Sequence, residues 1–131
     1  MAVDYQWRGP FDNAELNRLH AEGFGHALLD DDWRAQVEQH SLGWVCAREE
    51  GALVGFVNLA WDGGVHAFVL DTLVATSARR RGIGTRLVEL AVDGAGAAGC
   101  EWVHVDFDPD LAAFYFDACG FRSTPAGLHD L

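Results

Sequence analysis

The chain has 131 residues, of which 50% are hydrophobic, 11% aromatic and 22% charged. This length leaves room for a single domain over residues 1–131 with a substantial core, and the composition excludes a fibrous repeat or extensive disorder. Nine basic residues stand against twenty acidic ones, giving a net charge of −11. Such a field repels phosphate backbones and anionic bilayers and attracts cations, so we expect no nucleic acid partner and no membrane partner.

The cysteines and the N-terminus indicate a reducing compartment. Cys46, Cys100 and Cys119 are an odd number without C-x-x-C spacing, which favours free thiols over a disulfide framework or a zinc site. No basic stretch followed by an apolar one opens the chain, and no window approaches the roughly 18 apolar residues of a membrane span. We therefore expect a cytoplasmic protein with no metal ion.

The first third of the sequence predicts a strand and two helices. Residues 3–7 alternate as a short strand does, and residues 11–23 place Leu16 and Leu19 at helical spacing before a glycine. Three aspartates, residues 30–32, precede Trp33, where acidic side chains stabilise the positive end of a helix dipole. We interpret these aspartates as a helix cap rather than as metal ligands.

From residue 42 the hydrophobic period becomes two. The runs around residues 42–48, 53–60 and 65–74 are separated by Gly51 and by Gly63-Gly64, links too short for parallel crossovers. This pattern predicts an antiparallel meander. The run over residues 66–75 is the longest and most continuously apolar, so we expect it to be the central strand.

The last part of the chain alternates helix and strand. Ile83, Leu87, Leu90 and Ala91 recur at helical spacing in an amphipathic helix that ends within residues 93–99, and the alternation over residues 103–107 predicts a strand. A strand, helix and strand in one sheet form a right-handed parallel crossover. Asp108-Pro109 starts another helix to about residue 118, and residues 121–124 complete an edge strand. The fold class is a mixed α/β domain, mostly antiparallel with one parallel crossover.

The most informative segment is residues 73–87, LVATSARRRGIGTRL, where an apolar strand meets a glycine-containing turn that opens a helix. The first N–H groups of a helix lack internal partners and attract anions, and Gly82 and Gly84 remove the Cβ atoms that would obstruct a phosphate. Four of the nine arginines cluster here, although the start of a helix disfavours positive charge. A bound anion offsets that cost, so the segment predicts an anion site.

In this segment the sequence resembles the GNAT superfamily of N-acetyltransferases. Arg79, Gly82 and Gly84 match its acetyl-CoA motif Q/R-x-x-G-x-G/A, and the order of elements from about Leu53 to Gly120-Phe121 is similar to that superfamily's order. The resemblance implies acetyl-CoA as cosubstrate, with pantetheine bound by the backbone of Leu73 and Val74. It implies that the diphosphate is bound by Arg79 and by the amides of Arg81, Gly82, Ile83, Gly84 and Thr85.

One departure concerns the acid that protonates the departing thiolate. Many members of the superfamily carry a tyrosine four residues before the glycine of the Gly-Phe pair, and here that position is Phe116. Tyr115 lies one residue earlier, which rotates a side chain by about 100° around an α-helix. Tyr115 is the candidate acid if a local adjustment brings it to the sulfur; otherwise it is a core residue with its hydroxyl bonded elsewhere.

Two residues of the predicted central strand are candidates for the base. Direct attack on a thioester requires a neutral amine, and a carboxylate or a histidine can accept its proton. His66 and Asp71 are five residues apart, so a regular strand directs them to opposite faces. Asp71 is the preferred base, and its alternative role is a buried carboxylate that accepts from local amides.

Other motifs are weaker. Residues 94–99 spell G-x-G-x-x-G but follow a helix and precede a strand, the reverse of a dinucleotide-binding turn, so we interpret them as a helix-ending loop. Trp7, Trp33, Trp44 and Trp61 lie in the part that forms the acceptor side in the superfamily, and we expect at most one or two of them to contact substrate.

The sequence therefore predicts an enzyme that transfers an acetyl group from acetyl-CoA to a primary amine of a small cationic molecule or a peptide. The alternatives are a non-catalytic acyl-CoA-binding sensor, for which Phe116 is the strongest argument, and a structural module without CoA binding. A homodimer is compatible with the sequence.

Overall fold

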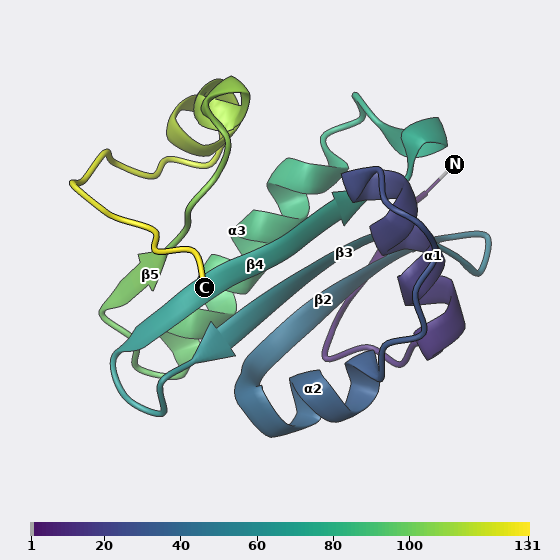
Figure 1. The fold of residues 1–131 in the computed structure, drawn as a ribbon, viewed down its shortest axis with the longest axis horizontal. Helices are drawn as coiled ribbons and strands as arrows, with labels where there is room; N and C mark the ends of the chain where they lie inside the picture. Colours follow the sequence, from purple (N-terminus) through teal and green to yellow (C-terminus); the bar gives the residue numbers. More distant parts are fainter. Residues whose placement is uncertain (1) are drawn as a thin grey trace.

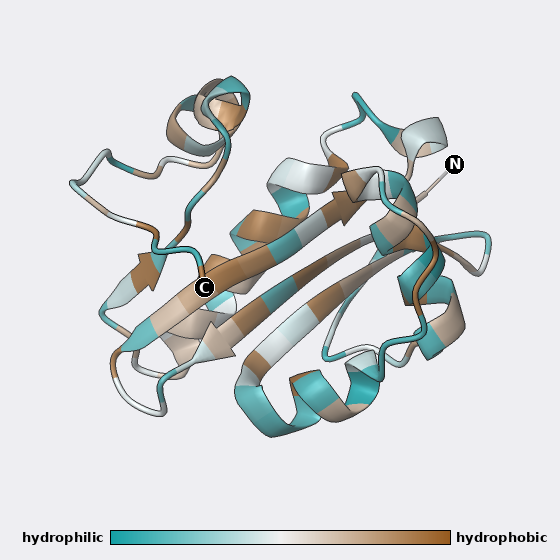
Figure 2. Cartoon of the chain, in the orientation of Figure 1, coloured by the Kyte–Doolittle hydropathy of each residue, from teal (hydrophilic) through white to brown (hydrophobic). Residues whose placement is uncertain are grey.

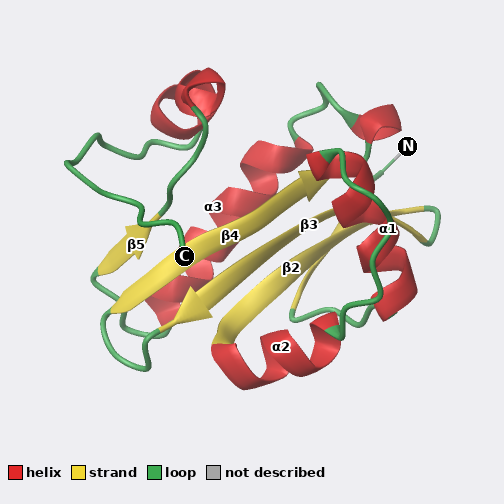
Figure 3. Cartoon of the chain, in the orientation of Figure 1, coloured by secondary structure: helices red, strands yellow, loops and turns green. Residues whose placement is uncertain are grey.

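The computed structural model describes residues 2–131, which fold into a five-stranded sheet with helices on both faces (Figures 1 and 3). The strands are β1 (Asp4–Trp7), β2 (Ser41–Glu49), β3 (Ala52–Trp61), β4 (His66–Val74) and β5 (Trp102–His104). The helices are α1 (Asn13–Phe24), α2 (Trp33–His40) and α3 (Ile83–Ala97), followed near the C-terminus by a π-helix (Ala113–Ala118); short 3₁₀ turns occupy Thr76–Ala78 and Pro109–Leu111.

The sheet has the order β1-β2-β3-β4-β5, so every strand pairs with its neighbour in the sequence. All pairs are antiparallel except β4 and β5, which run parallel and are linked through α3. The predicted fold class is confirmed. The predicted cap is confirmed as well, because the Asp32 carboxylate accepts a hydrogen bond from the Ala35 amide at 3.2 Å.

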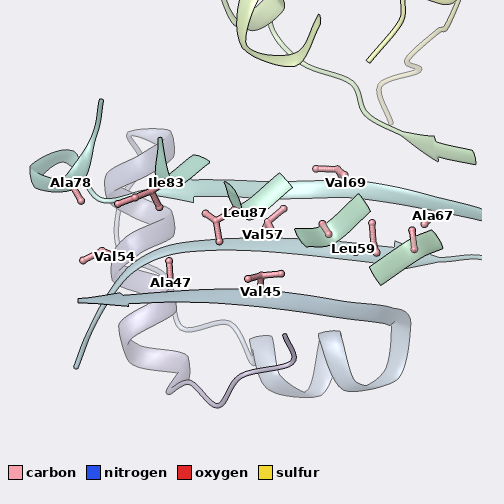
Figure 4. Packing of buried hydrophobic residues seen from close by; sticks show 12 residues of the cluster. Val45, Ala47, Val54, Val57, Leu59, Ala67, Val69, Ala78, Ile83 and Leu87 are labelled. Carbon is pink, nitrogen blue, oxygen red and sulfur yellow. The ribbon is translucent and has the colours of Figure 1, made fainter. Parts of the chain in front are cut away.

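Two apolar clusters hold the helices to the sheet, which is rich in hydrophobic residues along its central strands (Figure 2). On one face, Ile83 and Leu87 of α3 pack with Val45, Val57 and neighbouring strand residues (Figure 4). On the other face, α1 and α2 cover a second cluster that comprises Phe11, Leu16, Leu19, Trp33, Val37, Trp44, Cys46, Phe56 and Leu73. Side chains alternate between these faces because successive residues of a strand point in opposite directions.

The prediction that residues 66–75 form the central strand is wrong. β3 is the middle strand, and its residues 54–59 are all buried. In β4, Phe68 and Leu70 are 38% and 40% exposed on the face opposite Ala67 and Val69. The apolar run therefore reflects one buried face and one open face, not burial on both.

β4 and β5 pair over only three residues, from His66 opposite Trp102 to Phe68 opposite His104. Beyond this point β4 pairs with no further strand on that side among the described residues. β5 ends at His104, three residues before the predicted end at residue 107. The ladder between β3 and β4 shifts between Phe56 and Asn58, so one residue of β3 faces Asp71 and Thr72. Asp71 has a φ of 53°, the left-handed conformation of a β-bulge. The bulge lies where the strands separate.

The C-terminal part departs from prediction in two places. The helix predicted over residues 108–118 is a 3₁₀ turn followed by the π-helix, and the strand predicted over residues 121–124 is absent from the described chain. Pro125 follows at once and has no amide hydrogen to extend a ladder. The helix predicted to end within residues 93–99 continues to Ala97, so Gly94 and Gly96 are helical rather than in a loop.

Candidate acyl-CoA and acetyl-transfer site

The segment predicted to be an anion site lies where α3 begins. Gly82 caps the helix with a φ of 77°, and Arg80 before it is also left-handed, with a φ of 63°. The Arg86 amide donates to the Gly82 carbonyl at 3.1 Å and so starts the helical ladder. The amides of residues 82–85 precede that bond and are the ones that an α-helix cannot pair within itself. They point away from the helix, along its positive end.

The position of Gly84 brings three elements together. A Cβ at this residue would lie 3.6 Å from Val74 Cγ2 and 3.3 Å from the nearest ring carbons of Phe114. The start of α3, the end of β4 and the π-helix therefore meet at a glycine whose bare backbone leaves little room for a side chain. Phe114 gave no signal in the sequence because its neighbours are distant in the chain.

Two arginines of this turn, Arg79 and Arg81, have defined partners. Arg81 binds both carboxylate oxygens of Glu49 on β2, with Nη1 to Oε1 at 3.0 Å, and the hydrogen bonds hold the pKa of Glu49 below its usual range. Arg79 donates from Nε to the Val74 carbonyl at 3.3 Å. The Arg81 side chain is therefore tied to the sheet, and a ligand at this turn would meet its backbone rather than its guanidinium.

Leu73 and Val74 direct their backbone groups to opposite sides. The Ala75 amide donates to the Val54 carbonyl of β3 at 2.8 Å. Backbone groups of an antiparallel strand alternate between its two edges, so Leu73 bonds toward β3 and Val74 faces the open edge. The Leu73 side chain is 2% exposed and belongs to the apolar cluster that α1 and α2 cover. The backbone of Val74 thus faces the open edge, as the resemblance implies for a residue that binds pantetheine. The backbone of Leu73 faces β3 instead.

The π-helix changes which aromatic side chain faces the sheet. The Cys119 amide donates to the Phe114 carbonyl at 2.9 Å across five residues, one more than in an α-helix. A π-turn absorbs one additional residue without redirecting the chain, which compensates the one-residue displacement of Tyr115. Tyr115 is 6% exposed, whereas Phe116 is 36% exposed. The helix therefore departs from the α-helical register at Tyr115, whose buried hydroxyl is bonded within the protein.

Tyr115 is held against the bulge. Its hydroxyl donates to Thr72 Oγ1 at 3.2 Å, and its ring stacks on Phe107 with centroids 4.7 Å apart. Burial raises the pKa of the Tyr115 phenol above its usual value, while the hydrogen bond to Thr72 opposes part of that shift. The phenol therefore stays protonated at neutral pH, as an unshifted phenol does, and the shift makes it a weaker acid.

Asp71 is half-buried and is paired with a histidine. His20 of α1 places Nε2 3.2 Å from Asp71 Oδ1, and His20 Nδ1 lies 2.6 Å from His26 Nε2. The regular-strand argument that His66 and Asp71 face opposite sides fails here because the bulge turns Asp71 toward α1. His66 contacts His104 at 2.7 Å near the start of β4.

Sequence analysis missed His20, His26 and Thr72. The two histidines carry no metal-like or catalytic spacing, and Asp71 lies 51 residues beyond His20. Only the packing of α1 against β4 joins them. The four tryptophans are largely structural: Trp33 and Trp44 are buried, Trp7 packs against Gly43 and Gly94, and Trp61 donates to the Gly64 carbonyl.

Within residues 2–131, no helix is long and apolar enough to span a bilayer, and no three His, Cys, Asp or Glu side chains are grouped to bind a metal.

Comparison with known proteins identifies the family of the chain. The sequence model of the acetyltransferase (GNAT) family matches residues 7–121, and the chain belongs to this family. The chain is 44% identical over 103 residues to a probable glucosamine 6-phosphate N-acetyltransferase 2 of Oryza sativa subsp. japonica, covering 79% of this chain. It is 32% identical over 88 residues, 67% of this chain, to a mycothiol acetyltransferase of Mycolicibacterium vanbaalenii.

The chain spans only 58% and 29% of the lengths of these two relatives. Among solved structures, an aminoglycoside N-acetyltransferase in complex with CoA has a TM-score of 0.77 at 19% identity, covering 99% of this chain and 94% of that one. The fold is therefore one that binds CoA in a structural neighbour.

Proposed function

We propose that the protein transfers an acetyl group from acetyl-CoA to a primary amine of a small cationic molecule or a peptide. The observation that carries this proposal is the convergence of the α3 start, the open edge of β4 at Val74 and the Asp71 bulge beside Tyr115. A thioester placed along that edge would have its diphosphate at α3 and its carbonyl near the bulge.

The residues present suit acetyl-CoA. The amides of residues 82–85 can donate to a diphosphate, and nothing lies within 4 Å of the Cβ position at Gly82 to obstruct the backbone there. The Val74 carbonyl, on the unpaired edge, can accept from a pantetheine amide in place of the missing strand. Arg79, which now donates to that carbonyl, is within reach of the same region.

Transfer then needs two proton movements. The amine nitrogen attacks the thioester carbon, the C–S bond breaks, and the ammonium proton passes to Asp71. Tyr115 donates its phenolic proton to the departing thiolate and regains one from solvent. The phenol is protonated at neutral pH, so its proton is available when the thiolate forms. Holding both reactants at one strand edge contributes to the rate by proximity.

The acceptor class follows from charge and from relatives. A net charge of −11 attracts a cationic amine. Relatives and neighbours bear the names of glucosamine 6-phosphate and aminoglycoside acetyltransferases, and both of those named substrates carry amines. The competing function is an acyl-CoA-binding sensor, favoured by Phe116 in place of the superfamily tyrosine; the burial of Tyr115 weakens that argument.

Calorimetric titration with acetyl-CoA, followed by thiol release across a panel of amines, tests the proposal. We expect binding and amine-dependent release of free CoA. Gly84→Asp should weaken binding, because its side chain meets Phe114 and would add negative charge beside the proposed diphosphate position. Gly96→Asp, on the same helix with open space around it, is the matched control and should bind normally. Binding without release from any amine would favour the sensor, and no binding would reject both.

A further inference from the structure

Three side chains form a continuous hydrogen-bonded chain behind the bulge. The His26 Nδ1 atom lies 2.7 Å from the Ala27 carbonyl oxygen, His26 Nε2 lies 2.6 Å from His20 Nδ1, and His20 Nε2 lies 3.2 Å from Asp71 Oδ1. We call His20, His26 and Asp71 the bulge triad. The His20 ring is held by aromatic neighbours, with Trp33 at 5.0 Å and Phe24 at 4.7 Å between centroids.

The bonds of the bulge triad can be counted in protons. The Ala27 carbonyl and an ionised Asp71 carboxylate only accept, and each bond needs one hydrogen. Three bonds therefore require three hydrogens on the two imidazoles, whereas two neutral imidazoles carry two. The fully bonded triad thus holds one proton more than neutral histidines beside a carboxylate. That proton balances the carboxylate charge, wherever it lies along the chain.

We propose that His20 and His26 are positioning residues that make Asp71 a reversible proton acceptor for the transfer reaction. This inference rests on the proposed function. When the extra proton is absent, two acceptor atoms face each other at one of the three contacts. Taking the proton that the ammonium loses as the new C–N bond forms restores that bond. The proton then sits between Asp71 and the imidazoles, and it leaves to solvent before the next cycle.

Burial makes the hydrogen bond from His20 important to the Asp71 carboxylate. The side chains of His20 and Asp71 are 19% and 21% exposed, so a lone carboxylate there would lack most of its hydration. A charge-assisted bond to His20 replaces the lost water. The left-handed backbone of Asp71, rare for a residue other than glycine, occurs at the residue whose carboxylate contacts His20.

Other titratable groups near the bulge triad are bonded elsewhere. The Glu22 carboxylate on α1 accepts from the Thr76 amide at 2.6 Å, and Tyr115 of the π-helix donates to Thr72. α2 contributes the uncharged Trp33. On β4, His66 pairs with His104.

The proton count can be measured without any substrate. Proton and nitrogen NMR of the imidazoles in the full chain should show three slowly exchanging, downfield ring N–H signals from His20 and His26 at one pH. Exposed His40 serves as an internal reference for rapid exchange. Two or fewer such signals at every pH at which the protein is folded would overturn the proposal.

Kinetics test the role in transfer. His20→Gln keeps a donor toward Asp71 but cannot carry a proton, so kcat should fall about 100-fold or more, in the usual range for proton-transfer groups. KM for acetyl-CoA should stay unchanged, and the acidic limb of the pH profile should be displaced. His104→Gln, in the other histidine pair, is the matched control and should keep the wild-type rate and profile.

The positioning role of His20 and the proposed function can be rejected separately. If the wild-type protein acetylates amines and His20→Gln keeps both its rate and its pH profile, the positioning role is wrong and the proposed function stands. If the wild-type protein releases no thiol with any amine, the proposed function is wrong, and the role of the triad in transfer falls with it. In that case the number of ring N–H signals in the NMR spectrum still decides whether the bulge triad holds the extra proton.

Discussion

Replacing Tyr115 with phenylalanine separates chemistry from stability. The substitution deletes one hydroxyl that donates to Thr72 Oγ1 at 3.2 Å and leaves the ring in place against Phe107 and Phe114. A neutral hydrogen bond of this kind contributes about 1 kcal/mol to the free energy of unfolding. Truncation to alanine would cost about 3–5 kcal/mol, because the 6% exposed ring would leave a cavity.

The expected effect on turnover is larger. Loss of a positioned acid lowers the rate by about 100-fold, which corresponds to about 2.7 kcal/mol of barrier. Because burial raises the pKa of Tyr115, the wild-type rate should fall only at strongly alkaline pH, where the phenol loses its proton. The Tyr115→Phe variant should lack that alkaline limb.

The assay combines denaturant unfolding with thiol release over a range of pH. Phe116→Tyr, combined with Tyr115→Phe, is the matched control: residue 116 is on the exposed side of the π-helix, so a hydroxyl there should not restore the rate. An unaltered rate for Tyr115→Phe at every pH would remove the phenol from the mechanism. Restoration by Phe116→Tyr would show that the register of the helix in solution is α rather than π.

Three further substitutions test local features. Gly82→Ala should destabilise by about 1 kcal/mol through its φ of 77° alone, since nothing lies within 4 Å of the new Cβ, and thermal unfolding measures it; an unchanged Tm would contradict the left-handed cap. Gly94→Ala places a Cβ 2.3 Å from the Trp7 ring and should lower the free energy of unfolding by about 1–3 kcal/mol without altering acetyl-CoA affinity. Weaker binding would show that the G-x-G-x-x-G segment contributes to the cofactor site. Burial raises the pKa of Cys46 from 9.0 to about 12, so stability should hold below pH 9 and fall by about 1.4 kcal/mol per pH unit above it. Cys46→Ala should have a shallower alkaline decline in urea unfolding, and an identical decline would refute the assignment.

The sequence predicted those elements whose signal is local. α1, α2 and α3 follow from spacing and caps, and the meander follows from short glycine links. The α3 start was predicted because its two glycines and its helical periodicity lie within a few residues of one another.

The remaining features depend on backbone irregularities or on distant contacts. The bulge at Asp71 and the π-helix each insert one residue, and period-counting assumes regular strands and helices. The assignment of β4 as central failed because an apolar run does not reveal that Phe68 and Leu70 face an open surface. His20 is joined to Asp71 only by tertiary packing, which no spacing within the sequence encodes.

Titration of isotopically labelled protein with CoA, followed by amide NMR, tests the central claim most directly. The account predicts that the amides of residues 82–85 and of Val74 shift first and furthest, because the α3 start binds the diphosphate and the β4 edge binds the pantetheine. Shifts confined to other parts of the chain, with the amides of residues 82–85 unmoved at saturating CoA, would contradict it.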